Sequence, residues 1–327
     1  MTTKEKLLEL FELNRDTFLS GEEIAARLLV SRTAVWKGVK SLQADGYRID
    51  AVSNRGYRLS KSTDKLSKYG IKKYLKRELS QMDIEVREEV SSTNAIMHER
   101  AAAGAKGNAV LIASAQTAGR GRFERKFFSP QDTGVYMSLL LRPKNCAPSQ
   151  AVEFTTIAAV AMCEAIEAVS DEKAQIKWVN DIFINDKKVC GILTEASISL
   201  ENGFIDYVVL GVGVNVCAPQ NGFPNELENT AGAIFSSSKD DIKNRLTAEF
   251  LNRFMEYSGD AKRANYAAEY KKRSFVLGRK VLVLRNGNST GATALDIDES
   301  CHLLVRYDDG TTEYLSSGEI SVKLGAE

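Results

Sequence analysis

The stretch ASAQTAGRGRFERKFFSP, residues 113–130, lies between two apolar runs at 110–112 and 135–141. Each run predicts a buried strand, so the stretch is a loop held at both ends, where binding loops commonly lie. Gly119 and Gly121 let main-chain N–H groups approach a ligand closely. The stretch has no Walker phosphate-loop spacing. It predicts a site for an anionic, phosphate-bearing ligand, and a solvated basic loop is the alternative. Its cations are Arg120, Arg122, Arg125 and Lys126.

Length, charge and cysteine content limit the class of protein. A chain of 327 residues suggests two or three domains. The net charge of +1 means that nucleic-acid binding must come from a local patch. Five cysteines without a C-x-x-C pair favour reduced thiols, and only two histidines disfavour a histidine-based triad. No signal-peptide pattern or membrane-length apolar run occurs, so we expect a cytoplasmic protein without a membrane partner.

The N-terminal region predicts a winged helix-turn-helix. Helical spacing covers residues 4–13, 21–28 and 31–44, and Ser20 with Glu23 has capping-box spacing. Two β-prone runs, 47–52 and 55–59, predict a hairpin wing. The local excess of positive charge favours DNA binding over a protein-contact module. The residues expected to contact DNA are Ser31, Arg32, Thr33, Trp36, Lys37, Lys40 and Arg55.

The remaining chain divides into a mixed α/β region and a short all-β region. A polar linker is expected at 60–67, a strand at 84–90, helices at 95–103 and 151–169, a hairpin of 182–184 with 189–193, and a strand at 204–216. Helices at about 240–257 and 261–273 follow. Short strands at 280–284, 303–307 and 320–322 predict a small β barrel. The expected fold class is α+β, with domains at 1–62, 63–273 and 274–327.

Two motifs in the central region suit a small ligand. Ser92, Thr93 and Asn94 precede a helix, where such side chains serve either as caps or as contacts to a polar ligand. In the strand 204–216, Gly211, Gly213 and Asn215 occupy one face and valines the other. A face without side chains accommodates a flat ligand, although tight sheet packing produces the same pattern.

Lys188 is a third candidate. Strand alternation places it on the face of Cys190 and Ile192. A lysine on an apolar face indicates an anion nearby, unless its side chain extends outward to water.

Together the motifs resemble the biotin–protein ligase family. Each motif is weak alone, but the ordered set is specific and covers essentially the whole chain. With the helix-turn-helix in front, the chain is similar to the family's bifunctional members, which also repress the biotin operon. The resemblance implies a class II synthetase-like central domain and an SH3-like C-terminal barrel. The motifs are Ser92-Thr93-Asn94, Gln116 before Gly119-Arg120-Gly121-Arg122, Lys177-Trp178-Val179-Asn180-Asp181, Lys188-Val189-Cys190-Gly191 and Gly211-Val212-Gly213-Val214-Asn215.

The resemblance also implies an activity and a set of site residues. The activity is ATP- and Mg²⁺-dependent formation of biotinyl-5'-AMP and transfer of biotin to a lysine of the biotin carboxyl carrier protein. The adenylate-bound protein is expected to form a homodimer that binds operator DNA. Arg122 and Lys188 are the expected catalytic residues, and Asp181 is expected to reach magnesium through the phosphates. The expected biotin-binding residues are Ser92, Thr93, Asn94, Gln116, Arg120, Gly121, Arg122, Lys188, Gly211 and Gly213. The expected nucleotide-binding residues are Arg125, Lys126, Phe127, Asn180, Asp181 and Asn215.

Three positions depart from the family's pattern. Val179 stands where proline is usual, Glu124 where a second glycine is frequent, and Phe127 where tryptophan is frequent. These departures affect two expectations: how the far half of the loop becomes ordered, and how the loop stacks on adenine. Two alternatives remain open: a ligand-sensing transcriptional regulator without ligase activity, and a lipoate–protein ligase, which shares the central fold.

Overall fold

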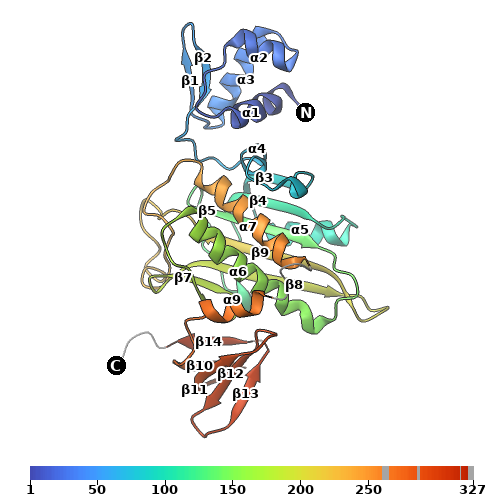
Figure 1. Cartoon of the computed structure of the whole chain (residues 1–327), viewed down its shortest axis with the longest axis vertical. Helices are drawn as coiled ribbons and strands as arrows, with labels where there is room; N and C mark the ends of the chain where they lie inside the picture. The colour runs from blue at the N-terminus through green and yellow to red at the C-terminus, as the bar shows by residue number, and fades with distance from the viewer. Residues whose placement is uncertain (260–264, 286–287, 317, 323–327) are drawn as a thin grey trace.

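The structure, a computed structural model, describes residues 1–259, 265–285, 288–316 and 318–322. A helical N-terminal domain and a C-terminal β-sheet lie at opposite ends of a central α/β domain (Figure 1). The predicted α+β class is confirmed. Residues 261–264 of an expected helix, and 323–327 of the expected C-terminal domain, lie outside the described residues.

The N-terminal domain is the predicted winged helix-turn-helix. Ser20 and Ser31 cap their helices by accepting hydrogen bonds from the backbone N–H groups of Glu23 and Ala34. The two strands of the wing pair antiparallel, with Val52 opposite Gly56. The elements are α1 (Thr3–Leu13), α2 (Gly21–Leu28), α3 (Arg32–Ala44), β1 (Ile49–Val52) and β2 (Gly56–Leu59).

The central domain is built on a seven-stranded mixed sheet of order β3-β4-β5-β9-β8-β7-β6. Its strands are β3 (Asp83–Val90), β4 (Ala109–Gln116), β5 (Gly134–Leu141), β6 (Gln175–Lys177), β7 (Asp181–Ile184), β8 (Lys187–Ile198) and β9 (Ile205–Asn215). Its helices are α4 (Lys68–Lys72), α5 (Thr93–Ala102), α6 (Ala151–Val169), α7 (Ile242–Ser258) and α9 (Tyr266–Arg273). Three 3-10 turns join them: η1 (Arg77–Leu79), η2 (Arg122–Glu124) and η3 (Pro148–Gln150).

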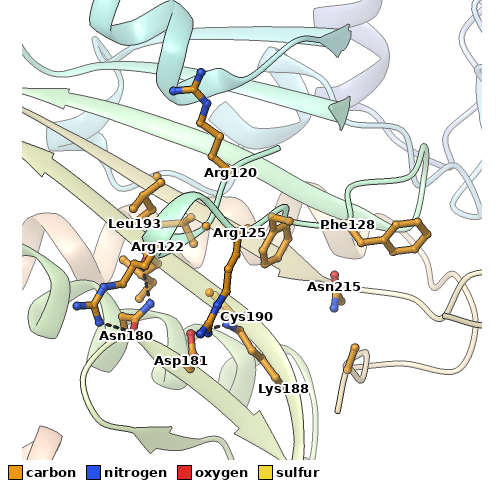
Figure 2. A pocket seen from close by; sticks show the side chains of 18 of the residues that line it. Arg120, Arg122, Arg125, Phe128, Asn180, Asp181, Lys188, Cys190, Leu193 and Asn215 are labelled. Carbon is orange, nitrogen blue, oxygen red and sulfur yellow. Dashed lines mark hydrogen bonds and ion pairs between the residues drawn. The ribbon is translucent and has the colours of Figure 1, made fainter. Parts of the chain in front are cut away.

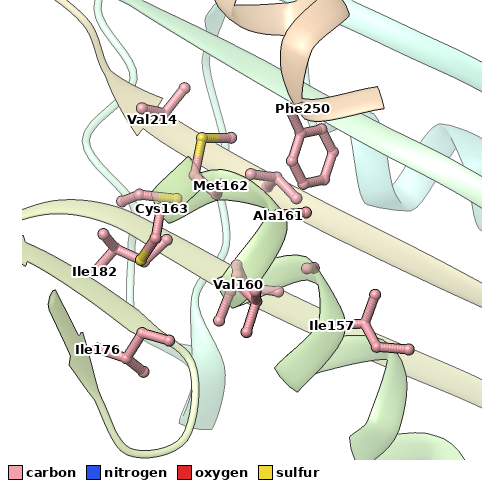
Figure 3. Packing of buried hydrophobic residues seen from close by; sticks show 14 of the residues in the cluster. Ile157, Val160, Ala161, Met162, Cys163, Ile176, Ile182, Val214 and Phe250 are labelled. Atoms are coloured by element: carbon pink, nitrogen blue, oxygen red, sulfur yellow. The ribbon is translucent and has the colours of Figure 1, made fainter. Parts of the chain in front are cut away.

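Helices cover the two faces of this sheet unequally. On one face, α6 packs between the sheet and Phe250 of α7, with Val160 and Cys163 fully buried (Figure 3). On the other face, α5 is the one helix of the described residues that packs, through a small cluster around Met97 and Leu140. The sheet is therefore left open beyond the start of α5.

The C-terminal domain is one five-stranded antiparallel sheet of order β13-β12-β11-β10-β14, consistent with the predicted SH3-like barrel. Trp178 of the central domain is hydrogen-bonded across this boundary, and Tyr270 supports the residue that follows it. The Trp178 indole donates to the carbonyl of Cys301 at 2.9 Å, and the Tyr270 hydroxyl donates to the carbonyl of Val179 at 3.0 Å. The strands are β10 (Lys280–Arg285), β11 (Asn288–Ile297), β12 (Leu303–Tyr307), β13 (Thr312–Leu315) and β14 (Glu319–Val322).

The segment 60–67 joins the first two domains, but it is not a solvated tether. Thr63 and Ser67 are buried, and the Ser67 N–H donates to Asn244 Oδ1 at 2.9 Å. Beside it, the fully buried carboxylate of Glu12 accepts from Lys73 at 2.9 Å, which links α1 to α4. The N-terminal domain is therefore docked on the central domain through polar side chains.

Candidate active site

A cavity of about 470 Å³ opens on the sheet face that α6 does not cover. The β4–β5 loop, the β7–β8 hairpin, β9 and the start of α5 surround it. Every residue expected to bind biotin or nucleotide lines this one cavity. These are Ser92, Thr93, Asn94, Gln116, Arg120, Gly121, Arg122, Arg125, Lys126, Phe127, Asn180, Asp181, Lys188, Gly211, Gly213 and Asn215.

One end of the cavity is built from short, uncharged side chains. The Ser138 hydroxyl lies 2.5 Å from Asn94 Oδ1 and 2.7 Å from Thr93 Oγ1. Gln116 Oε1 accepts from the Thr93 N–H at 2.9 Å, and its amide nitrogen donates to Ser129 at 3.1 Å. Thr93, Asn94 and Ser138 are each no more than 5% exposed. Thr93, Asn94 and Gln116 line the cavity, and Ser129 and Ser138 hold them from behind. We call these five residues the neutral end.

The bare face of β9 is filled by protein groups. A Cβ atom on Gly211 would lie 2.1 Å from Asn94 Oδ1, and one on Gly213 would lie 2.6 Å from the ring of Phe127. The ring also packs edge-on against Tyr136, at 6.3 Å between centroids. Burial raises the pKa of Tyr136 to about 12, so its hydroxyl stays protonated and donates to the Pro130 carbonyl. The glycines thus let Asn94 and Phe127 reach the floor of the cavity.

The opposite end carries charge. Lys188 Nζ lies 2.6 Å from Asp181 Oδ1, an oxygen with no hydrogen-bond partner of good geometry. The Lys188 side chain is 35% exposed, so it remains accessible to a ligand. A cation and a carboxylate therefore meet at the edge of the cavity.

The face predicted for Lys188 is wrong. A β-bulge pairs Ile182 with Cys190 but Phe183 with Lys188, which leaves Val189 as an extra residue and resets the alternation. Lys188 consequently approaches the cavity side of Gly191, where a Cβ atom would lie 3.3 Å from its Nζ. Cys190 is fully buried in the core, and burial raises the pKa of its thiol. It is therefore not a poised nucleophile.

The arginines of the loop differ in direction. Arg122 donates to Asn180 Oδ1 at 3.2 Å, while the Asn180 amide nitrogen donates to the Ile192 carbonyl at 2.9 Å. Arg125 extends toward Asp181, whereas Arg120 points away from this end (Figure 2). The Asn180 side chain, in the turn between β6 and β7, helps to set the position of Arg122. Arg122, Asn180, Asp181 and Lys188 are called the cationic end below.

The tip of the loop has an unusual backbone. Phe123 and Glu124 have φ angles of 54° and 60°, in the left-handed region that glycine adopts most easily. The Gly121 N–H donates to the Arg125 carbonyl at 2.7 Å, which closes the turn around them. Glu124 thus stands in a conformation suited to the glycine that the family often has there.

The cavity also includes residues that the sequence did not suggest. The segment 223–231 borders the cationic end, and its Thr230 carbonyl accepts from the Lys188 N–H at 2.8 Å. Ile320 and Ser321 of β14 complete the rim. Ser138 lies behind the cavity wall, where it hydrogen-bonds Thr93 and Asn94. It is the one serine in the otherwise largely apolar strand GVYMSLLL, a signal that could have been recognised. The rim residues carry no comparable signal, because only folding brings them near the loop.

Comparisons with known proteins agree with this geometry. The biotin/lipoate A/B protein ligase family matches residues 86–215, an HTH domain matches 3–58, and the biotin protein ligase C-terminal domain matches 276–323. The bifunctional ligase/repressor BirA of Bacillus subtilis (strain 168) is 39% identical over 241 residues, 74% of this chain and 73% of that protein. The chain belongs to the biotin–protein ligase family.

Other relatives extend the likeness. BirA of Escherichia coli (strain K12) is 27% identical over 313 residues, 94% of this chain and 93% of that protein. The Aquifex aeolicus biotin protein ligase in complex with biotin and ATP shares the fold, with a TM-score of 0.61, 24% identity, and coverage of 74% of this chain and 99% of that chain. The predicted family and central fold are confirmed, and the three domains are those of a bifunctional ligase and repressor.

The residues expected to contact DNA lie apart from the cavity, in the N-terminal domain. All are exposed, and Ser31 also caps α3. Trp36 is 52% exposed on that helix. In the wing, the Arg55 guanidinium stacks 4.2 Å from the centre of the Phe18 ring. Helix and wing therefore present aromatic and basic groups to solvent.

The metal prediction concerns Asp181 alone. Among the described residues, no three His, Cys, Asp or Glu side chains gather closely enough to hold a metal ion. Mg²⁺ in nucleotide enzymes is commonly held by one or two carboxylates plus substrate phosphates. A single carboxylate such as Asp181 suits a magnesium ion that is bound mainly by the phosphates of the nucleotide. In the same described part of the chain, no helix has the length and apolar character to cross a bilayer.

Proposed function

We propose that the cavity activates biotin with ATP and transfers it to a carrier protein, and that the same chain represses biotin genes. The observation that carries the proposal is the pairing of the neutral end with the cationic end in one cavity. Biotin has an uncharged bicyclic head and a carboxylate tail, and the two ends match these parts. Family membership and the helix-turn-helix domain support the same conclusion.

The first step joins two anions. An oxygen of the biotin carboxylate attacks the α-phosphorus of ATP, the bond to the bridging oxygen breaks, and diphosphate leaves. Lys188 and Arg122 reduce the repulsion between carboxylate and phosphate, and they stabilise the charge that develops in transfer. Asn180 and Asp181 hold these two cations in place. The uncharged residues expected to bind biotin, at the neutral end and beside it, contact the bicyclic head. Arg125, Lys126, Phe127 and Asn215 contact the nucleotide.

Mg²⁺ supplies additional neutralisation of the phosphates when it is bound, and Asp181 is the residue placed to reach it. The mixed anhydride that results is readily hydrolysed. The loop 119–127 therefore orders over the product and excludes water.

The second step needs no enzyme nucleophile. The amine of an acceptor lysine attacks the activated carbonyl, an amide forms, and AMP leaves. The acceptor is the biotin carboxyl carrier protein. All five cysteines are free thiols, which supports a cytoplasmic location.

Repression follows when acceptor is scarce. The adenylate-bound protein accumulates, forms a homodimer, and binds operator DNA through α3 and the wing. Adenylate acts by binding the dimer-forming state more tightly than the other state.

A pyrophosphate-release assay tests the ligase. The protein with biotin, ATP and Mg²⁺ is expected to release pyrophosphate once per active site, and continuously when carrier protein is added. A ligand sensor without ligase activity would release none. Substituting lipoate for biotin is expected to abolish the signal, and a preference for lipoate would identify a lipoate ligase.

A DNA-binding assay tests the repressor. Lys37→Ala combined with Lys40→Ala is expected to weaken binding to the upstream region of biotin-synthesis genes by at least tenfold, because both lysines lie exposed on α3. Pyrophosphate release should be unchanged. Lys144→Ala with Lys280→Ala removes the same charge from exposed sites elsewhere and should leave DNA binding intact.

A further inference from the structure

Glu195 lies behind the neutral end and belongs to none of the motifs that predicted the site. It extends from β8, and its Oε2 accepts a hydrogen bond from Asn94 Nδ2 at 2.7 Å. It does not line the cavity. Any influence of this carboxylate on a ligand must therefore pass through Asn94.

The partners of Asn94 determine which way its amide points. A carboxylate can only accept, so it selects the nitrogen end of the amide, whereas the Ser138 hydroxyl at 2.5 Å donates to the oxygen end. The Leu193 carbonyl, 3.4 Å from Nδ2, favours the same orientation weakly. Without Glu195, both orientations of the amide become accessible, because a serine hydroxyl can donate or accept.

Glu195 is itself held from the other side. His98 follows Asn94 by one helical turn, and its buried Nε2 lies 3.3 Å from Glu195 Oε2, close enough for an ion pair but without hydrogen-bond geometry. His98 Nδ1 lies 3.4 Å from the hydroxyl of Tyr207, and the two rings meet edge-on. The chain of contacts from Tyr207 to Asn94 keeps the carboxylate directed at the amide.

We propose that Glu195 is a positioning residue of the biotin site, which fixes the polarity that Asn94 presents to the ring system of biotin. The inference rests on the proposed function. The ureido ring of biotin carries N–H donors and a carbonyl acceptor, so a reversed amide would set donor against donor or acceptor against acceptor. An unpaired polar group in an enclosed site weakens binding strongly.

Calorimetric titration of biotin into the full-length protein tests this role. Glu195→Ala is expected to weaken biotin binding by about ten- to a hundredfold, the range for loss of a charge-assisted hydrogen bond. Glu195→Gln keeps an acceptor oxygen and should recover most of the affinity. The affinity for ATP should change less than twofold in both variants. Glu201→Ala, an exposed carboxylate on the β8–β9 hairpin, is the matched control and should bind biotin normally.

A double-mutant cycle shows whether Glu195 acts through Asn94. In an Asn94→Ala background, Glu195→Ala should weaken biotin binding by less than twofold further. Full additivity, or normal biotin affinity of Glu195→Ala, would overturn the positioning role while leaving the ligase assignment intact. If the wild-type protein itself neither binds biotin nor releases pyrophosphate, the proposed function fails and this inference falls with it.

Discussion

The two ends of the cavity are constructed in opposite ways. At the neutral end, Thr93, Asn94 and Ser138 are buried on regular elements, and each hydrogen-bonds another protein group. At the cationic end and on the loop above it, the cations are carried by long side chains, and Arg125 and Lys126 are exposed. One end is rigid before any ligand arrives, and the other can be ordered by the ligand.

This difference indicates how affinity and reactivity are divided. A preformed set of buried polar groups binds a neutral head with little loss of conformational entropy. We expect the cationic loop instead to gain order from a charged product, which it then protects from water. Substitutions at the neutral end should therefore alter biotin affinity, and those at the cationic end should alter rate and product retention.

The largest effect is expected from Lys188→Ala. Removing a positioned cation from a site of developing negative charge should lower the rate of pyrophosphate release by about 10²–10³-fold. Biotin affinity should fall much less, because the neutral end is untouched. Rapid-quench measurement of adenylate formation gives the rate.

The matched control for this variant is Lys173→Ala, an exposed lysine in the turn before β6. It should keep the wild-type rate. A near-normal rate for Lys188→Ala would show that the charge difference between the two ends has no part in the chemistry.

Gly211→Ala should produce the next effect, at the neutral end. Its methyl group would lie 2.1 Å from Asn94 Oδ1, on a central strand that cannot retreat. Overpacking of this kind costs roughly 1–3 kcal/mol, so biotin should bind about five- to a hundredfold more weakly, with ATP affinity preserved. Gly259→Ala tests the general effect of removing a glycine, because its φ is −88° and an added Cβ atom would have no neighbour closer than 3.5 Å. Normal biotin binding by Gly211→Ala would mean that the neutral end is not rigid.

Arg122→Gly is expected to release the adenylate about tenfold faster, because a charge-assisted contact is worth roughly 1.5–3 kcal/mol and part of it is recovered by neighbouring cations. Free adenylate acylates lysines at random, so bystander proteins should become biotinylated. Streptavidin blotting of a mixture with serum albumin measures this. Arg120→Gly is the comparison: because Arg120 points away from Asn180 (Figure 2), an equal leak from it would show that the contact to Asn180 is not what retains the product.

The neutral end was easier to predict from the sequence than the cationic end. Ser92, Thr93 and Asn94 act locally at a helix start, and the alternating glycines of β9 follow strand periodicity, so pattern alone located them. Secondary structure was predictable for the same reason, and α6 begins and ends at the predicted residues, Ala151 and Val169.

Long-range packing explains what the sequence could not show. The bulge at Val189, which redirects Lys188, depends on how β7 pairs with β8 and leaves no mark in a single strand. Glu195 reads as an ordinary solvent-facing strand residue until α5 is placed over it. The segment 60–67 looked like a tether because its partners are distant in the sequence: Asn244, which accepts from the Ser67 backbone N–H, is 177 positions away.

The smallest expected effect concerns the tip of the loop above the cationic end. It tests whether this loop, unlike the neutral end, becomes ordered when the ligand binds. Glu124 has a φ of 60°, a conformation that costs an ordinary residue about 1 kcal/mol and glycine almost nothing. Glu124→Gly should therefore favour the ordered loop and tighten adenylate binding about two- to fivefold, although the greater freedom of glycine in the disordered loop offsets part of the gain. Glu124→Ala separates charge from conformation, since it removes the same carboxylate but keeps the Cβ atom. Equal tightening in both variants would attribute the effect to charge, and no tightening in Glu124→Gly would show that the loop tip already adopts this turn before the adenylate binds.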